Sequence, residues 1–182
     1  MFLHKRDYIT EFGYSERYRS RKVGPDTRDL YLLHFEVKGH CEFCDFDIHE
    51  GGACLLSANL VHAFRIVDES TSYWFCFGGE RAGEILSAFG IPTDRHARLV
   101  INRPRELFSE LARFFELARE FSETVEGEKY ALSALMSALP RLSVAEVAAA
   151  TGFSSATRFS QAFSGVCGIS PSGFQKQVRG KK

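Results

Sequence analysis

The sequence lacks any long hydrophobic run, which limits where the protein is expected to work. None of its 182 residues lies in a stretch that approaches the roughly 20 apolar residues of a membrane span. Its start, MFLHKRDYITEFGYSER, contains no apolar segment like that of a secretory signal peptide. We therefore expect a cytoplasmic protein with no membrane partner.

Motifs of enzyme chemistry are also missing. The sequence has no nucleophile elbow, no phosphate-binding loop and no dinucleotide-binding glycine motif. Its five cysteines are an odd number and lie among apolar neighbours, so buried free thiols are expected rather than disulfides. We therefore predict that the protein is not an enzyme.

One cysteine pair has the spacing of a metal or redox motif. Cys41 and Cys44 form a Cys-x-x-Cys, but a second pair of this kind is missing. Positions three apart in a strand point to opposite faces, so the two thiols cannot easily hold one ion. The sequence therefore predicts no metal and no cofactor, although four further potential ligands lie nearby: His40, His49, Cys54 and His62.

The composition is 45% hydrophobic and 13% aromatic, which is enough for one good core and a smaller one. Short apolar or alternating segments recur between polar and glycine-containing links, at residues 30–37, 41–48, 53–56, 61–67 and 72–77. Regularly spaced short strands of this kind predict a β-sandwich or a small barrel.

Alternation along two of these strands identifies a candidate interior. If His62 faces the inside of a barrel then Phe64 does too, and on the following strand Ser72, Trp74 and Cys76 share one face. An indole ring can pack on a ligand while His and Ser side chains exchange hydrogen bonds with it. Alternatively, these side chains fill a closed core, and His62 bonds to a backbone carbonyl.

Two helices are expected after the strands. Pro104 is a typical first-turn residue, and apolar residues recur after it at steps of three and four up to position 118. A second helix is expected after residues 126–128 and ends at Pro140. The apolar positions of these helices that could face a second copy of the chain are Leu107, Leu111, Phe114, Phe115, Leu132, Leu135 and Leu139.

The C-terminal segment has the outline of a helix-turn-helix. Ser143 and Glu146 form a capping box, Val144 opens an apolar face at helical spacing, and Gly152 supplies the turn. A second helix is expected from Ser154, with polar side chains directed away from its core.

Charge is divided unevenly along the chain. Residues 141–182 carry six basic side chains and one acidic one, a net charge of +5, and the remaining 17 basic and 22 acidic residues sum to −5. A basic end on an acidic body suits a phosphate-binding module. A solvated basic tail is the alternative interpretation.

Residues 145–177, AEVAAATGFSSATRFSQAFSGVCGISPSGFQKQ, resemble the second helix-turn-helix of the AraC/XylS family of transcription regulators. The segment keeps the family's order of an Ala-rich helix, Gly152-Phe153, Phe159, Phe163, Gly168, Ser170-Pro171 and Phe174. The resemblance implies DNA binding through the exposed side of the second helix and the basic residues after it. The residues expected to contact DNA are Ser155, Thr157, Arg158, Gln161, Lys176 and Arg179.

The resemblance is incomplete in this region. The family's DNA-binding unit holds two helix-turn-helix motifs joined by a long helix, and only the second has a counterpart here. Arg158 stands where an aromatic residue is common, and Gln161 and Ser164 replace residues that are frequently basic. We therefore expect weaker phosphate anchoring than in relatives, so that DNA affinity depends on a dimer or is lost.

The preceding part resembles the cupin-like effector-binding domain of the same regulators. LLSANLVHAFRI and YWFCFGGERAGEILSAFGI follow that domain's order of a strand, a loop ending in His, and a Trp/Phe strand before a glycine turn. The His-x-His pair with which the metal ligands of catalytic cupins usually begin is missing. The resemblance implies a small-molecule effector, for which a sugar is one candidate, held by His62, Phe64, Ser72 and Trp74.

The expected fold is α+β, with a cupin-like β-barrel over residues 1–100, a helical linker and dimerisation region over 101–140, and a helix-turn-helix over 141–182. The resemblance implies a homodimer formed through the helical region, and helices that simply cover the barrel of a monomer are the alternative. The sequence predicts a ligand-responsive, sequence-specific DNA-binding regulator. Two other hypotheses stay open: an effector-binding, dimerising protein that has lost DNA recognition, and a cupin-type metalloprotein.

Overall fold

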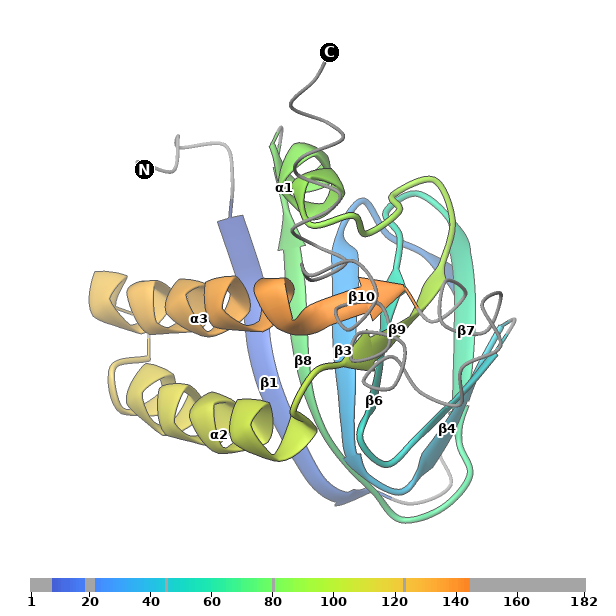
Figure 1. Ribbon diagram of the computed structural model, residues 1–182, viewed down its shortest axis with the longest axis horizontal. Coiled ribbons are helices and arrows are strands. Elements are labelled where there is room, and N and C mark those ends of the chain that lie inside the picture. Colours follow the sequence, from blue (N-terminus) through green and yellow to red (C-terminus); the bar gives the residue numbers. More distant parts are fainter. Residues whose placement is uncertain (1–7, 19–21, 45, 80, 123, 145–182) are drawn as a thin grey trace, which may run out of the picture. The chain divides into compact units, whose positions relative to one another are not determined.

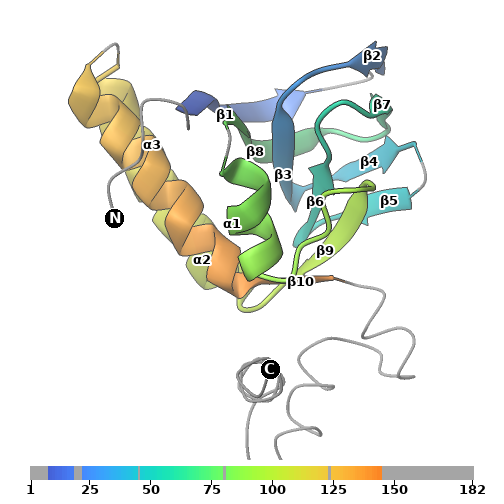
Figure 2. The same cartoon turned by 90° about the horizontal axis from the view of Figure 1, so that it is seen from above.

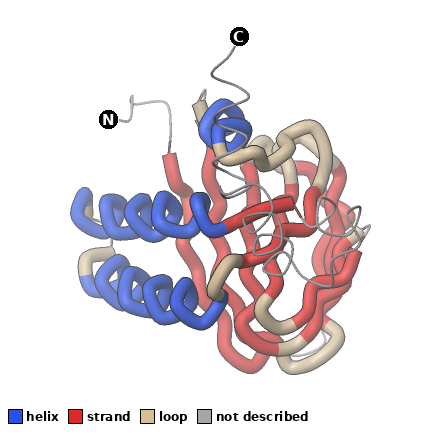
Figure 3. Tube along the Cα trace, in the orientation of Figure 1, coloured by secondary structure: helices blue, strands red, loops and turns tan. Residues whose placement is uncertain are grey.

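The computed structural model describes residues 8–18, 22–44, 46–79, 81–122 and 124–144. The chain divides into two compact units, residues 1–143 and 144–182, and the description below concerns the first. In the described part of this unit, more residues lie in strands than in helices, and two long helices precede the last strand (Figures 1 and 3).

The described strands form two sheets that face each other. The six-stranded sheet has the order β1 (Tyr8–Tyr18), β8 (Ser70–Gly78), β3 (Tyr31–Lys38), β6 (Gly52–Leu56), β9 (Ala97–Ile101) and β10 (Leu142–Val144). The four-stranded sheet has the order β2 (Lys22–Thr27), β7 (Val61–Ile66), β4 (His40–Phe43) and β5 (Phe46–His49). The α+β fold with a cupin-like domain is confirmed, but hydrogen bonds do not join the described strands into one closed barrel.

The long helices, α2 (Pro104–Glu120) and α3 (Val125–Ala138), lie side by side next to β1 (Figures 1 and 2). Pro104 opens α2, where its fixed φ suits the first helical turn and its missing N–H is not needed. A shorter helix, α1 (Ala82–Ala88), follows β8, and a 3-10 turn, Leu139–Arg141, leads from α3 to β10. None of the helices in the described ranges has the length and apolar content needed to cross a membrane.

Aromatic contacts attach the helices to the outer face of the larger sheet. Phe12 of β1 stacks on Phe75 of β8 with ring centroids 4.3 Å apart, and Phe115 of α2 forms a T-shaped pair with Phe12 with ring centroids 5.4 Å apart. Phe75 also meets Phe35 of β3, at 6.1 Å. Offset and edge-on pairs of this kind are favourable beyond their buried area. The larger sheet is thus covered by α2 on its outer face, and its central strands are buried on both sides.

The space between the two sheets holds a second core. Along each strand, side chains that point to the other sheet alternate with side chains that point away from it. The inward-facing side chains of both sheets form this core. The buried members are Cys41, Phe43, Ile48, Cys54, Leu56 and Ile66, with Leu32, Phe46 and Phe64 packed against them.

Two expected element boundaries are corrected by the structure. Residues 41–48, expected as one strand, form a hairpin in which β4 and β5 pair with each other. The helix expected after residues 126–128 begins earlier, at Val125, because the Thr124 hydroxyl oxygen accepts a hydrogen bond from the backbone N–H of Gly127 at 3.2 Å. In the sequence, Thr124 and Gly127 resemble a loop before a helix, which explains why the predicted start of this helix is too late.

The start of the expected helix-turn-helix is also corrected. Val144, expected on the apolar face of a helix, is the last residue of the edge strand β10. Next to this strand, the backbone N–H of Asn102 donates a hydrogen bond to the carbonyl of Arg141 at 2.8 Å. Backbone pairing at the sheet edge therefore keeps the chain extended up to Val144.

Candidate ligand-binding interior

The strands β3 and β8 place four polar or aromatic side chains on the inner face of the larger sheet. In their antiparallel register, His34 is opposite Trp74 and Glu36 is opposite Ser72. Directly opposed residues point to the same face of a sheet. Two of the expected effector-site residues, Ser72 and Trp74, therefore share a face with His34 and Glu36.

The other two expected effector-site residues lie on β7, in the facing sheet. Phe64 stacks on Phe43 of β4 with ring centroids 5.3 Å apart. His62 is buried, and its Nδ1 lies 3.4 Å from the carbonyl oxygen of Leu60. The four predicted residues thus belong to the two opposite walls, and His62 already has a backbone partner.

Trp74 packs directly over a glycine of the neighbouring strand. Gly13 of β1 is opposite Trp74, and a Cβ atom built on Gly13 would overlap Cε2 and Cζ2 of the indole ring. The position of the ring therefore depends on the missing side chain at Gly13.

Substitution of Gly13 by alanine is expected to displace Trp74. The added methyl group overpacks the strand pair, which typically costs about 1–3 kcal/mol of stability. Trp74 is the single tryptophan of the chain, so the emission maximum of intrinsic fluorescence should shift as the ring moves. The matched control is Gly83→Ala in α1, where the new methyl group meets only the Tyr31 hydroxyl, at 3.1 Å. An unchanged emission spectrum in Gly13→Ala would contradict this packing.

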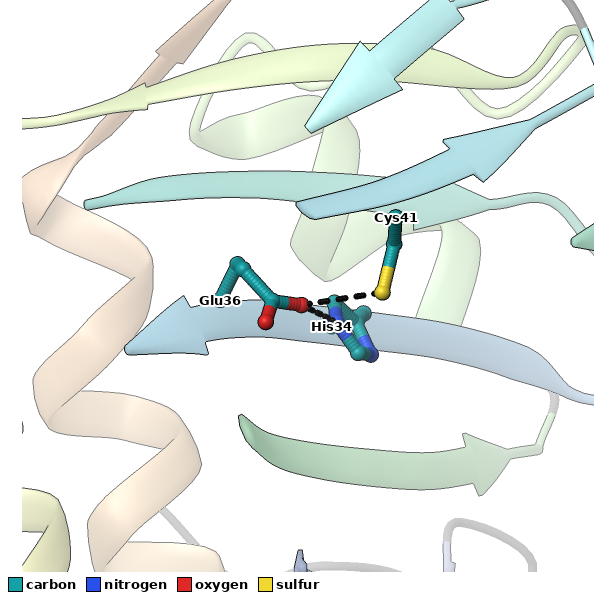
Figure 4. A group of neighbouring side chains, drawn as sticks. All are labelled: His34, Glu36 and Cys41. Carbon is teal, nitrogen blue, oxygen red and sulfur yellow. Dashed lines mark hydrogen bonds and ion pairs between the residues drawn. The ribbon is translucent and has the colours of Figure 1, made fainter. Parts of the chain in front are cut away.

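A buried polar cluster lies at the β3 and β4 side of the interior (Figure 4). Nε2 of His34 lies 2.9 Å from Oε2 of Glu36, and the Cys41 thiol donates to the same oxygen at 3.1 Å. The Ser70 hydroxyl of β8 donates to the second oxygen, Oε1, at 2.6 Å. Glu36 has no exposed surface, so these neighbours supply the interactions that water would otherwise provide.

The environment of this cluster keeps its thiol protonated at neutral pH when no cation is present. Burial and, to a smaller extent, the nearby Glu36 carboxylate together raise the pKa of Cys41 to about 12. Cys54 of β6 is fully buried, and burial raises its pKa as well. Cys41, Cys54 and Cys76 are buried free thiols, as expected from the sequence, whereas Cys44 is free but exposed, which corrects the expectation that it is buried.

Sequence reasoning missed His34 and Glu36. The composition of residues 30–37 predicts an apolar and aromatic strand, although Leu32, His34 and Glu36 follow the period of two that marks one strand face. Cys41 and Cys44 are buried and exposed respectively, which agrees with the argument that they cannot easily hold one ion together. The polar alternation along β3 was the signal that could have revealed the cluster.

The helical positions expected at a dimer interface are largely used within the chain. Phe115 packs against Tyr14 and Tyr73, with ring centroids 5.6 Å and 6.0 Å away. Phe114 and Leu132 are half-buried. The remaining four side chains are buried inside the protomer and unavailable to a partner in this conformation: Leu107, Leu111, Leu135 and Leu139.

The residues expected to contact DNA all lie outside the described residues. These are Ser155, Thr157, Arg158, Gln161, Lys176 and Arg179.

Two sheets that face each other, with α2 on one outer face, enclose polar and aromatic side chains between them. The family model of the AraC-like ligand-binding domain matches residues 8–140, and that of a helix-turn-helix domain matches residues 128–177. The chain therefore belongs to the family of AraC-like ligand-binding domains. No curated protein matches the chain.

Solved structures that are similar to the chain include ToxT from Vibrio cholerae. One ToxT structure shows 12% identity and a TM-score of 0.38, over 73% of this chain and 55% of ToxT. ToxT bound to (E)-4-(8-methylnaphthalen-1-yl)but-3-enoic acid shows 10% identity and a TM-score of 0.39, over 72% and 55% of the two chains. The chain thus spans little more than half the length of these structures.

Proposed function

We propose that the protein is a ligand-responsive, sequence-specific DNA-binding transcription regulator. The main support for this proposal is that one chain matches two family models. A ligand-binding domain matches residues 8–140, and a helix-turn-helix domain matches residues 128–177. We propose three functional regions: an effector-binding domain over residues 1–100, a helical connection over 101–140 and a DNA-binding domain over 141–182. No catalytic role is proposed.

The proposed effector site is the space between the two sheets. An apolar or ring-shaped part of a small molecule would pack against Trp74 and Phe64, which come from opposite walls. Polar groups of the same molecule would exchange hydrogen bonds with His62 and Ser72, both of which are buried. For His62 this requires that the ligand replace its contact with the Leu60 carbonyl.

The helix α3 is the proposed connection between ligand and DNA. Residues 128–140 belong to both family matches, and they cover most of α3. On its inner side this helix buries Ala131, Ala134 and Leu135 within the ligand-binding unit. A ligand that favours one packing of α3 would therefore also favour one placement of the segment that follows it.

A homodimer would place two helix-turn-helix units, one from each chain, on two half-sites of DNA and so raise the affinity for DNA. The exposed apolar side chains of α3 and its surroundings, Phe121, Val125 and Met136, are available for such pairing, together with the half-buried Phe114 and Leu132. An effector-binding dimer without DNA recognition is the second candidate, because two of the positions expected to contact DNA, Arg158 and Gln161, depart from the family's usual residues.

Substitution of Arg158 or Gln161 by alanine is expected to weaken binding to a specific DNA site. Loss of a base contact costs about 1–3 kcal/mol, or roughly 5- to 150-fold in affinity, because arginine pairs with guanine and glutamine with adenine in the major groove. Affinity is measured by fluorescence anisotropy on genomic fragments that the wild-type protein retains. The charge-matched control is Arg105→Ala, an exposed position on α2. Equal affinity of wild type, Arg158→Ala and Gln161→Ala would remove both residues from the recognition face.

A further inference from the structure

The buried polar cluster brings together three kinds of metal-ligating atom. The imidazole nitrogen of His34, a carboxylate oxygen of Glu36 and the sulfur of Cys41 all lie within 4.8 Å of one another. Figure 4 shows the two β3 side chains and the β4 thiol converging on one point between the strands. All three residues are buried, Glu36 and Cys41 completely.

Apolar side chains surround this group, which makes a purely structural role costly. Cys41 belongs to the core that includes Phe43, Ile48 and Leu56, and the His34 and Phe43 rings form a T-shaped pair with centroids 5.3 Å apart. A buried carboxylate needs compensating charge or hydrogen bonds, and well-packed hydrophobic residues in its place are often equally stabilising. Hydrogen bonds to His34, Cys41 and Ser70 satisfy the Glu36 carboxylate within the fold, and the converging imidazole, carboxylate and thiol are also the groups that bind a zinc ion.

We propose that His34, Glu36 and Cys41 bind one zinc ion or a chemically similar divalent cation. A thiolate, a carboxylate and a neutral imidazole together carry two negative charges, so a divalent ion makes the buried site neutral overall. Sulfur and nitrogen ligands select zinc-like ions over magnesium and calcium, which prefer oxygen. The Cys41 proton is released to solvent when the sulfur binds the ion, and no oxidation or reduction takes place.

The observed spacing is close to that of a zinc site. Tetrahedral zinc with ligand bonds of about 2.0–2.3 Å requires its ligand atoms to be roughly 3.3–3.8 Å apart. Oε2 of Glu36 lies 2.9 Å from Nε2 of His34 and 3.1 Å from Sγ of Cys41. These atoms would therefore have to move apart by about half an ångström to bind the ion. Ser70 holds the other carboxylate oxygen at 2.6 Å and thereby orients Glu36. Three protein ligands leave the fourth position to water.

A second group of potential ligands lies on the exterior and provides an internal comparison. His40 and His49 are paired across β4 and β5 with stacked rings 4.3 Å apart, and Nε2 of His40 lies 3.8 Å from the Asp47 carboxylate. His49 and Asp47 are exposed, and none of these ligands is a thiol. Metal bound there would show no sulfur coordination, so the two locations are distinguishable by spectroscopy.

Cobalt and zinc titrations of the full chain test the buried site. After treatment with a chelator, the wild-type protein is expected to bind one equivalent of Co²⁺ with a near-ultraviolet sulfur-to-cobalt absorption band, and Zn²⁺ is expected to displace it. Cys41→Ser should abolish the band and lower zinc affinity by roughly 100-fold, since it removes a direct ligand. Cys76→Ser, which changes a buried cysteine outside the cluster, and His49→Ala should leave both unchanged.

The absence of a sulfur-to-cobalt band in the wild-type protein overturns the proposal, however the variants fold. A band that survives in a folded Cys41→Ser protein, or that disappears in His49→Ala, overturns it as well. If Cys41→Ser fails to fold by circular dichroism, His34→Gln replaces it and should lower zinc affinity while the sulfur band persists with altered intensity. These outcomes are independent of DNA binding.

Discussion

Replacement of Leu111 by alanine is expected to lower the free energy of unfolding of the ligand-binding unit by about 2–5 kcal/mol. The side chain lies on the inner side of α2 and has no exposed surface. Its loss removes buried apolar contacts and leaves a cavity that the packed helix and sheet cannot close. Urea denaturation followed by circular dichroism and by Trp74 fluorescence measures the change.

The control for Leu111 is Met136→Ala on α3. Met136 is 37% exposed, so truncation should cost under about 1 kcal/mol. If the two substitutions destabilise the protein equally, α2 does not pack on the sheet as described.

Replacement of Glu36 by alanine is expected to lower the free energy of unfolding by about 3 kcal/mol or more in protein freed of metal, because each buried polar group left unpaired costs about 1–3 kcal/mol. The carboxylate is the shared partner of His34, Cys41 and Ser70, and its removal leaves their polar groups buried and unpaired. Glu36→Gln keeps the shape and one acceptor oxygen, so its cost should be smaller. Urea denaturation in the presence of a chelator gives both values.

The matched control is Glu42→Ala, a glutamate on β4. Its carboxylate pairs with the Arg65 guanidinium at 2.7 Å, but the two side chains are 39% and 56% exposed. Exposed ion pairs contribute under about 1 kcal/mol, so this substitution should be nearly neutral. Equal stability of the Glu36 and Glu42 variants would show that the buried cluster does not support the fold.

Alternation and helix signals in the sequence predict much of this fold. The strands β7 and β8, the start of α2 at Pro104 and the common inner face of Ser72 and Trp74 all follow from local periodicity. The sequence predicts a single strand where β4 and β5 form a hairpin, because no Gly or Pro stands between Phe43 and Phe46. Turn chemistry without these residues gives a weak local signal.

Long-range pairing accounts for other features that local reasoning did not predict. The strand β1 pairs with β8, more than fifty residues later, with Thr10 donating to the Cys76 carbonyl at 3.0 Å. Gly127 lies inside α3 because a side chain there would overlap the carbonyl of Phe121 at the end of α2. The glycine therefore allows α3 to lie close to the end of α2. From a single sequence, a glycine with this function looks the same as a glycine that ends a helix.

The central claim is that this short chain reads specific DNA and responds to a small ligand. The most direct test is binding of the purified protein to mixed genomic DNA fragments at two salt concentrations, with sequencing of the retained fragments and the mass of the protein measured in solution. The account predicts that a dimer retains a defined site and that affinity falls as salt rises, because bound phosphates release counterions. Retention that is absent, or that shows no preferred sequence at either salt concentration, would contradict it.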